Sequence, residues 1–484
     1  MAVGMPRTVV IGGGIAGLTA AFRLHRECPD WPLTIVEEAG RLGGKIVTER
    51  VNGFVIEGGP DCFLAAKPAA VRLCRELGLE DRLQGTAPNG RRAYVMRRGK
   101  LHELPDGFTG LVPSRLWPLM KTPLLSPLGK LRMAVEGFVP ALRVDQDESL
   151  ASFVHRRLGV EAYERLLEPL LGGICAGRGD ELSLGAIFPQ LQRMEREHGS
   201  LSRAILAARK NRKHAVPVAR GSTPPSAFLT LRNGLAEIVE KIHAGLSGAN
   251  FRLGRRALRV RRRECGYSVD LDGGESLGAE ALVLATPAHA TANLLGDIDA
   301  ETAGVLKEIP YASTSTVSLA FPRSVLRVPL TGSGYVVPRL EGRPVLGCTW
   351  TSTKFPHRSP EGSVLIRAFI GRAGEDHLGE APDEQLLRWV KEELRSVLDL
   401  ESEPSMMRIY RWPKGMPQYT LGHLGRVARV EQRLASHPGL FVAGSSYRGI
   451  GIPDCIDSGE RAADQVREFL RQAHTAPVPQ KETA

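Results

Sequence analysis

The sequence predicts an α/β fold whose principal sheet is parallel and is covered by helices. The segments that predict it are two strands with a helix between them and two later strands: residues 8–11, 15–26 and 33–37, then residues 281–285 and 439–443. A strand, a helix and a strand within about thirty residues make a βαβ unit, which implies parallel strands. The later strands have the same apolar character, and a proline or glycine ends each of them. The sheet is therefore expected to collect strands from distant parts of the chain.

Two other regions separate these strands. Residues 90–215 carry helical patterns, at 149–158 and 161–171, whereas residues 305–415 alternate as strands do, at 315–321, 335–338 and 364–370. Residues 221–225 form the clearest linker, and the polar tail after His474 is expected to be disordered. The predicted domains are residues 1–90 with 230–300 and 425–474 (discontinuous), 90–215 (helical), 305–424 (mixed sheet) and the tail 475–484.

The composition is that of a globular protein. The chain has 484 residues, 42% hydrophobic and 24% charged, which suits two or three domains and excludes disordered or fibrous classes. A net charge of +11 favours an anionic partner without choosing one. Seven scattered cysteines and twelve histidines form no pattern of metal ligands, so we predict no metal and no disulfide framework.

The chain has no apolar run long enough to span a bilayer. Residues 8–22 are apolar, but three consecutive glycines interrupt them and no cleavage site follows, so we predict no signal peptide. The expected location is the cytoplasm.

A glycine motif follows the first strand. Gly12, Gly13, Gly14, Ile15, Ala16 and Gly17 fit G-x-G-x-x-G, in which Gly12 permits a tight turn, Gly14 admits a pyrophosphate and Gly17 lets helix and strand pack closely. Glu37 ends the next strand, where a carboxylate binds ribose hydroxyls. The motif predicts a Rossmann-like dinucleotide site, and the glutamate disfavours NADP without separating NAD from FAD.

The following segments favour FAD. Arg41-Leu42-Gly43-Gly44-Lys45 and Glu57-Gly58-Gly59-Pro60-Asp61 resemble the FAD-binding signature of the flavin amine oxidase superfamily. Near the C-terminus a strand stops at Gly444, and residues 449–453 lead into a helix with a buried face. The start of that helix would stabilise negative charge on a reduced flavin.

Further motifs narrow the resemblance. They are Leu-Leu-Gly-Gly-Ile-Cys-Ala-Gly at 170–177, Leu-Ser at 182–183, Phe-Pro at 188–189, Met-Glu-Arg-Glu-His-Gly-Ser-Leu at 194–201, Ala-Thr-Pro-Ala at 285–288, Trp-Pro at 412–413, Pro-Gln-Tyr-Thr-Leu-Gly-His at 417–423 and Tyr-Arg-Gly-Ile-Gly-Ile-Pro-Asp-Cys at 447–455. Together they resemble the oxygen-dependent protoporphyrinogen oxidase family, including its coproporphyrinogen III-oxidising relatives, over residues 7–470.

The resemblance implies a six-electron oxidation of a porphyrinogen to a porphyrin in heme biosynthesis, with FAD as cofactor, O2 as acceptor and H2O2 as product. It implies FAD contacts at Gly12–Gly17, Glu37, Glu38, Arg41, Lys45, Gly59, Pro60, Asp61, Cys62, Ala257, Ser445, Ile450, Gly451 and Ile452. No cysteine stands at residues 445–446, so the FAD is expected to be non-covalent. We predict no dedicated catalytic residue, because flavin N5 would be the reacting group.

The resemblance also implies a substrate site at Gly173, Val336, Leu346 and Phe369. Some family members bind a substrate propionate through an arginine where this chain has Ala93. Arg91 and Arg92 are adjacent and could replace it after a small shift, although strand alternation sends neighbouring side chains to opposite faces; we assign the contact to Arg92. Protoporphyrinogen IX is favoured, with coproporphyrinogen III left open.

Several alternatives stay open at this point. One is an amine oxidase or carotenoid desaturase on the same scaffold, and another is a flavin- or porphyrin-binding protein without activity. Residues Arg203, Arg209, Lys210, Arg212 and Lys213 form a basic run that suits either a solvated helix face or, with the apolar stretch 111–125, peripheral contact with an anionic membrane. No aromatic residues interleave with these charges, so we predict no nucleic-acid partner. The oligomeric state stays open, a homodimer included.

Overall fold

The computed structural model describes residues 5, 7–105, 108–109, 112–113, 117–142, 146–212 and 226–475. The predicted linker at 221–225, Lys213 of the basic run and residues 476–484 of the predicted tail lie outside these ranges.

The principal sheet is parallel, as predicted. Its strands in spatial order are β12 (Asn250–Leu253), β2 (Leu33–Glu37), β1 (Thr8–Ile11), β16 (Ala281–Leu284) and β22 (Leu440–Val442). Every neighbouring pair runs parallel, with Thr8 level with both Leu33 and Ala281. All four predicted strands are confirmed, and β12 joins them at an edge.

The two faces of this sheet have different covers. Helices α1 (Ile15–Glu27), α2 (Pro68–Glu76), α11 (Ala236–Ala244) and α18 (Ile452–Thr475) pack on the face that presents Val10, Ile35 and Val283. Side chains alternate along a strand, so Val9 and Ile11 point to the other face. That face is covered by β13 (Ala257–Arg262), β14 (Tyr267–Leu271), β15 (Ser276–Ala279), α12 (Ala288–Leu295), α13 (Ala300–Lys307) and α17 (His423–Leu434).

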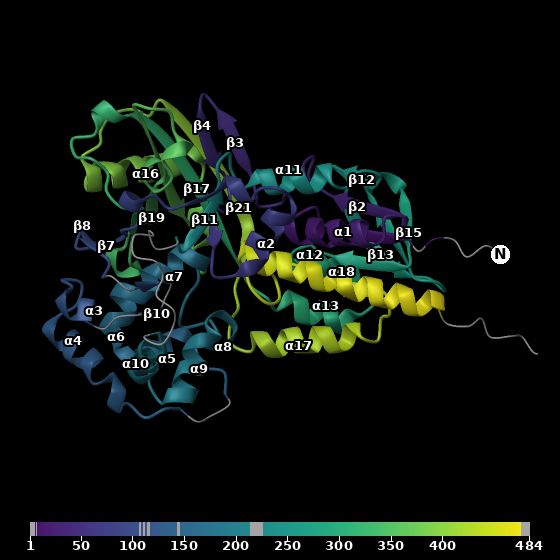
Figure 1. Cartoon of the computed structure of the whole chain (residues 1–484), viewed down its shortest axis with the longest axis horizontal. Coiled ribbons are helices and arrows are strands. Elements are labelled where there is room, and N and C mark those ends of the chain that lie inside the picture. The colour runs from purple at the N-terminus through teal and green to yellow at the C-terminus, as the bar shows by residue number, and fades with distance from the viewer. Residues whose placement is uncertain are drawn as a thin grey trace, which may run out of the picture.

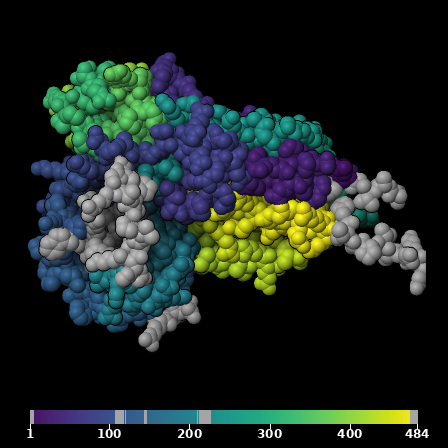
Figure 2. All heavy atoms as spheres, viewed as in Figure 1, coloured from purple at the N-terminus to yellow at the C-terminus, as the bar shows by residue number. Residues whose placement is uncertain are grey.

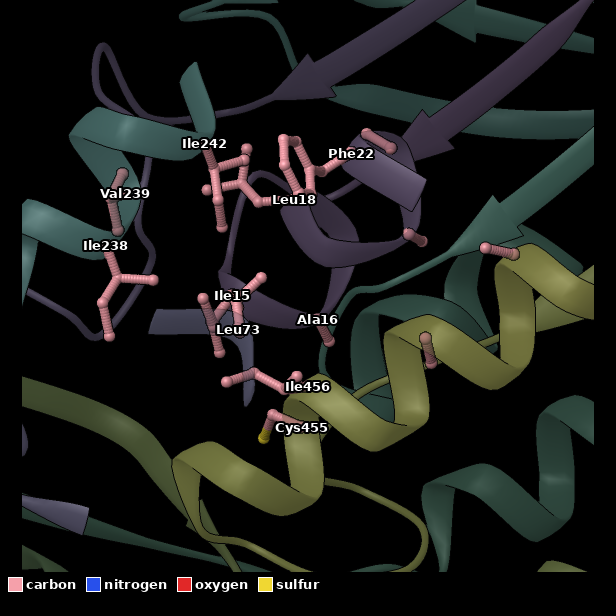
Figure 3. Close-up of a cluster of buried hydrophobic side chains, with 14 of the residues drawn as sticks. Ile15, Ala16, Leu18, Phe22, Leu73, Ile238, Val239, Ile242, Cys455 and Ile456 are labelled. Carbon is pink, nitrogen blue, oxygen red and sulfur yellow. The ribbon is translucent and has the colours of Figure 1, made fainter. Parts of the chain in front are cut away.

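Helix α1 lies at the centre of the helical cover. Figure 3 shows Leu18 and Phe22 turned towards Ile242 of α11, whereas Ala16 is turned towards α18, which carries Cys455 and Ile456. In Figure 1 α18 runs alongside α1, although the two helices come from opposite ends of the chain. This packing holds the glycine turn before α1 close to the C-terminal loop before α18.

A second, seven-stranded sheet is mixed. Its spatial order is β21 (Met406–Pro417), β17 (Tyr311–Pro322), β20 (Ser363–Ile370), β19 (Val345–Trp350), β18 (Gly334–Val336), β7 (Tyr94–Arg97) and β8 (Lys100–Glu103). Only the β18–β7 pair is parallel in this sheet, and α16 (Asp383–Leu398) covers one face. The sequence placed residues 94–103 in the helical region. They instead form the edge hairpin of this sheet, because β18, far along the chain, supplies the pairing partner.

The third region is helical and lies beside the second sheet (Figures 1 and 2). Its helices are α3 (Trp117–Lys121), α4 (Pro127–Ala134), α5 (Leu150–Leu158), α6 (Val160–Ala162), a π-helical turn (Tyr163–Leu167), α7 (Glu168–Cys175), α8 (Leu184–Ile187), α9 (Pro189–His198) and α10 (Leu201–Arg212). Buried Glu195, within the 194–201 motif, pairs with Arg156 and Arg157.

Shorter elements connect the three regions. They are β3 (Thr48–Val51), β4 (Phe54–Glu57), β5 (Phe63–Leu64), β6 (Leu83–Gly85), β9 (Phe108–Thr109), β10 (Val112–Pro113), β11 (Phe228–Leu231), α14 (Thr351–Lys354) and α15 (Asp376–Gly379). No helix in the described ranges combines the length and the apolar character that a membrane crossing requires.

Candidate functional site

The glycine turn between β1 and α1 has the geometry that its motif predicts. Gly12 has φ +110°, a conformation that favours glycine. A Cβ on Gly17 would lie 2.0 Å from the Gly12 carbonyl oxygen, so only glycine permits this close packing of helix on turn. The first turn of α1 thus begins directly at the carboxyl end of β1.

Gly14 leaves an open cradle at the start of α1. A Cβ built on Gly14 would meet no atom within 4 Å, and Gly14 has no side chain to cap the first-turn amides. Amides at a helix N-terminus bind anions, because they carry partial positive charge and lack acceptors within the helix. This cradle fits the pyrophosphate of a dinucleotide.

Glu37 is tied to the same turn. Its carboxylate accepts hydrogen bonds from the Gly13 amide at 2.6 Å and the Ala39 amide at 2.9 Å. The Arg255 amide donates to the Glu37 carbonyl oxygen, which brings nearby Ala257 to this end of the sheet. Each carboxylate oxygen can accept a second hydrogen bond, so Glu37 can still bind a ribose hydroxyl.

Arg41 and Glu38 lie at the rim of the site. The Arg41 guanidinium donates to the Gly44 carbonyl oxygen at 2.8 Å and is exposed. Glu38 forms an exposed ion pair with Arg256. Both side chains would have to exchange these partners to bind a cofactor, so their predicted contacts remain predictions.

Lys45, which follows Gly44, and Lys414 both lie close enough to His289 for their charges to act on it. Burial lowers the pKa of Lys45, and no carboxylate pairs with it among the described residues. Burial, followed by the charges of Lys414 and Lys45, lowers the pKa of His289, whose Nδ1 is buried without a hydrogen-bond partner. Buried polar groups without partners are rare in native proteins. An anionic cofactor would supply the missing partner, so these residues fit the FAD implied by the sequence.

The segment 58–62 is held by the second sheet. The Gly58 carbonyl oxygen accepts from Trp412 Nε1 at 2.9 Å, Thr316 Oγ1 at 3.0 Å and Arg367 Nη2 at 3.2 Å. Arg367 also donates to the Gly59 carbonyl oxygen. Strands β21, β17 and β20 therefore fix this segment together.

A partly buried ion pair continues from that segment. Lys354 Nζ lies 2.9 Å from Asp61 Oδ2 and 3.4 Å from Cys62 Sγ. Burial alone would raise the pKa of Asp61, but the charges of Lys354 and Arg367 hold it well below its ordinary value. Burial and the Asp61 charge raise the pKa of the Cys62 thiol to about 12, so it stays protonated at neutral pH.

The C-terminal loop brings the last predicted cofactor residues to the site. Ser445 follows β22, and residues 450–452 lead into α18, whose Asp454 accepts from the Gly451 amide at 3.1 Å. Ile450 packs on the apolar cluster of the helical region, which also includes Val336 of β18. The loop therefore lies between the helical region and the second sheet.

Four predicted substrate residues come together between α7 and the second sheet. A Cβ on Gly173 would lie 3.5 Å from Val336 Cγ1, and one on Gly172 would lie 3.5 Å from Leu346 Cδ2. A register shift between Val345 and Gly347 places Leu346 at a bulge. Phe369 is on β20, where Arg367 lies over its ring at 4.9 Å. Such distances are ordinary van der Waals contacts, so this part of α7 lies directly beside the apolar face of the sheet.

Arg92 is not part of this group. Its side chain is 63% exposed and makes only a long contact, 3.8 Å, with Glu103. Val95 is level with Val336 and packs with the helical region, whereas Tyr94 packs on the opposite side. By strand alternation Ala93 lies on the side of Val95. The predicted propionate contact of Arg92 remains a prediction.

Sequence reasoning missed several residues that the structure brings to this site: Arg367, Lys354, Thr316, Trp412, His289 and Lys414. Arg367 carried a usable signal, because a charged residue inside the apolar run 363–370 is rarely buried without a specific role. Thr316 and Lys354 carried no such signal, because the role of an ordinary polar residue depends on partners that are distant in the sequence.

Comparison with known proteins gives relatives over nearly the whole chain. Residues 15–467 match the model of the flavin containing amine oxidoreductase family. Coproporphyrinogen III oxidase of Bacillus subtilis is 37% identical over 97% of this chain and 100% of its own length. Protoporphyrinogen oxidase 1 of Arabidopsis thaliana chloroplasts is 30% identical, over 96% of this chain and 88% of its own length. A crystal structure of a provisionally named protoporphyrinogen oxidase from Exiguobacterium sp. 255-15 is 33% identical, with a TM-score of 0.84, and the match covers 97% of this chain and 100% of that one.

Proposed function

Because this chain belongs to the flavin-containing amine oxidoreductases and, among them, to the protoporphyrinogen and coproporphyrinogen III oxidases, we propose that it oxidises a porphyrinogen to the porphyrin with non-covalent FAD. Dioxygen takes up the electrons and leaves as hydrogen peroxide. The observation that carries the proposal lies on β20: Arg367 contacts the segment 58–59, and Phe369, two residues on, belongs to the predicted substrate group. Cofactor segment and substrate face thus share one strand.

The residues of the chain have defined tasks in this reaction. Bound FAD supplies a two-electron acceptor, and the conversion needs three two-electron steps. The chain positions the macrocycle against the apolar face made by Val336, Leu346 and Phe369 and keeps water from it. Arg367, with Thr316 and Trp412, holds the segment 58–62 in place. Aromatisation supplies driving force, so positioning and desolvation are the main tasks left to the protein.

We assign residues 1–90, 230–300 and 425–474 to cofactor binding and residues 305–424, extended by the hairpin 94–103, to the substrate face. Residues 117–142 and 146–212 form the helical region, which contributes Gly173. The sequence favours protoporphyrinogen IX. The more similar relatives, at 37% identity, are named for coproporphyrinogen III, which has two propionates where the other substrate has vinyl groups. We therefore propose coproporphyrinogen III as the preferred substrate and protoporphyrinogen IX as the alternative.

The test is anaerobic mixing of the FAD-loaded protein with each porphyrinogen. We expect flavin absorbance to bleach in a single turnover and to return on admission of air, with porphyrin fluorescence and one H2O2 formed per two electrons. Initial rates under air then rank the two substrates. A flavin that stays oxidised with both porphyrinogens but bleaches with amines would establish the amine-oxidase alternative, and a flavin that bleaches with neither would establish a binding protein.

We also propose that the helical region attaches peripherally to an anionic membrane. Leu128 and Leu131 lie on the exposed face of α4, Val135 caps its C-terminal end, and Phe138 follows. Their exposed fractions include 77% for Leu128 and 86% for Phe138. Lys130 lies among them, and the chain carries a net charge of +11. Apolar insertion and charge would together favour anionic lipid.

Replacing Leu128 and Phe138 together by serine should weaken binding to vesicles that contain phosphatidylglycerol by about tenfold or more, because each large apolar side chain contributes about 1.5–3 kcal/mol when buried. Co-sedimentation measures the binding. Val328→Ser is the matched control, because Val328 is 72% exposed and belongs to the region of the second sheet. Equal binding of both variants, or no binding by the unmodified chain, would contradict the proposal.

A further inference from the structure

Residues 418–423, which we call the strap, connect the helical region with the C-terminal loop. They belong to the Pro-Gln-Tyr-Thr-Leu-Gly-His motif, to which the proposed reaction gives no role. On the helical side, Gln418 Nε2 donates to the Cys175 carbonyl oxygen of α7 at 2.9 Å. Two backbone hydrogen bonds also join the strap to the segment after α7. The Ser183 amide donates to the Tyr419 carbonyl oxygen, and the Leu421 amide donates to the Glu181 carbonyl oxygen, each at 2.8 Å.

On its other side the strap is hydrogen-bonded to the loop 445–449. The Tyr419 hydroxyl donates to the Ser445 carbonyl oxygen and accepts from the Gly449 amide, each at 2.7 Å. One hydroxyl therefore bridges both ends of the loop. The Tyr419 ring stacks on His423, with centroids 3.9 Å apart and planes 11° apart, and His423 Nε2 lies 2.8 Å from the Tyr447 carbonyl oxygen.

The side-chain hydrogen bonds of Gln418 and Tyr419 hold two different parts of the predicted site. Gln418 holds the C-terminal end of α7, the helix that carries Gly173, and Tyr419 holds the loop that leads to Ile450. Both side chains are buried, at 3% and 1% exposure, so neither bond is weakened by competing water. Reaction between substrate and cofactor requires the reacting atoms within about 3–3.5 Å, and a displacement of about 1 Å can cost a hundredfold in rate.

We infer that Gln418 and Tyr419 are positioning residues: Tyr419 shapes the loop that receives FAD, and Gln418 sets the substrate helix at a fixed distance from that loop. The second half of this inference rests on the proposed function, whereas the first half concerns cofactor binding alone.

The first experiment uses Tyr419→Phe, which removes only the hydroxyl and keeps the stack on His423. Apoprotein is titrated with FAD and binding is followed by quenching of flavin fluorescence. We expect about tenfold weaker binding of FAD. Two hydrogen bonds of about 1 kcal/mol each are lost, and part of that free energy reduces the stability of the FAD-free protein instead of its affinity for FAD. The flavin absorption band and the reduction potential should shift as well, since the loop amides change position.

Tyr267→Phe is the matched control. The Tyr267 hydroxyl is equally part of a buried side chain and donates to the Pro438 carbonyl oxygen at 2.9 Å, remote from the loop. Its loss should reduce thermal stability without changing FAD affinity, spectrum or potential. If Tyr419→Phe binds FAD as tightly as Tyr267→Phe does, with an unchanged spectrum, Tyr419 has no positioning role.

The second experiment uses Gln418→Met, which keeps the volume and removes the bond to α7. We expect FAD affinity within about twofold of the unmodified chain, whereas kcat/KM for porphyrinogen falls about fivefold, as the loss of about 1 kcal/mol predicts, with part of the fall in kcat. A lower thermal stability with unchanged KM and kcat would overturn the role of Gln418. A chain that oxidises no porphyrinogen would overturn the proposed function, and the FAD titrations of Tyr419→Phe would still decide the first half.

Discussion

Replacement of Gly14 by valine should give a folded protein that no longer retains FAD. The cradle beside Gly14 is open: a Cβ at this position meets no atom within 4 Å, so the backbone has room for the first atom of the new side chain. In the complex it would occupy the place where the pyrophosphate approaches the backbone. Steric overpacking costs up to about 3 kcal/mol, which corresponds to roughly a hundredfold loss of affinity.

The measurement is the flavin content of purified protein together with the rise in melting temperature on addition of FAD. The unmodified chain should be yellow and gain stability with FAD, because a ligand that binds only the folded state stabilises it. Gly14→Val should be colourless and gain nothing. Gly278→Val is the control, since a Cβ at Gly278 also meets no atom within 4 Å but lies on β15. Full flavin retention by Gly14→Val would place the cofactor elsewhere.

Separating the partly buried pair of Asp61 and Lys354 should have a large effect on stability. Lys354→Met leaves the Asp61 carboxylate without its ion-pair partner; loss of one partner of a fully buried pair costs about 3–5 kcal/mol, and we expect about 2–3 kcal/mol for this partly exposed pair. Because Asp61 belongs to the segment 58–62, we expect FAD to be lost as well. The double variant Asp61→Asn with Lys354→Met should recover part of the stability, since neither position of the pair then carries a charge.

Above about pH 4, where Asp61 of the unmodified chain is ionised, the two single variants should respond to pH in opposite directions. In the unmodified chain the pKa of Asp61 is lowered, so its contribution is present above the unfolded value of about 3.9 and disappears as the pH falls towards the folded value. For Lys354→Met, the deficit in unfolding free energy should be large at pH 7 and shrink on acidification, because protonation removes the unpaired charge. For Asp61→Asn, the unpaired lysine should make the deficit shrink as the pH rises. Denaturant unfolding at several pH values measures both, and parallel pH profiles would contradict a buried ion pair.

The local features of the chain were predictable from the sequence. Strands β1, β2, β16 and β22 and helix α1 follow from short runs of residues, because backbone preference and side-chain alternation act within a few positions. Glycines at 12, 14 and 17 define the dinucleotide turn for the same reason: the conformation and close contacts of a turn depend on its own residues. The turn that we expect to receive FAD could therefore be predicted without a structure.

The tertiary structure decided the rest. The hairpin 94–103 joins a sheet whose other strands lie more than two hundred residues away, so no local pattern could assign it. Arg367, Thr316 and Trp412 come from three strands and meet on one carbonyl group, that of Gly58. Such convergence depends on contacts between residues that are far apart in the chain, whereas local sequence patterns report only on residues that are close together in the chain. By itself the sequence determined the kind of cofactor and the turn that receives it; the tertiary structure determined which buried charges and strands hold cofactor segment and substrate face together.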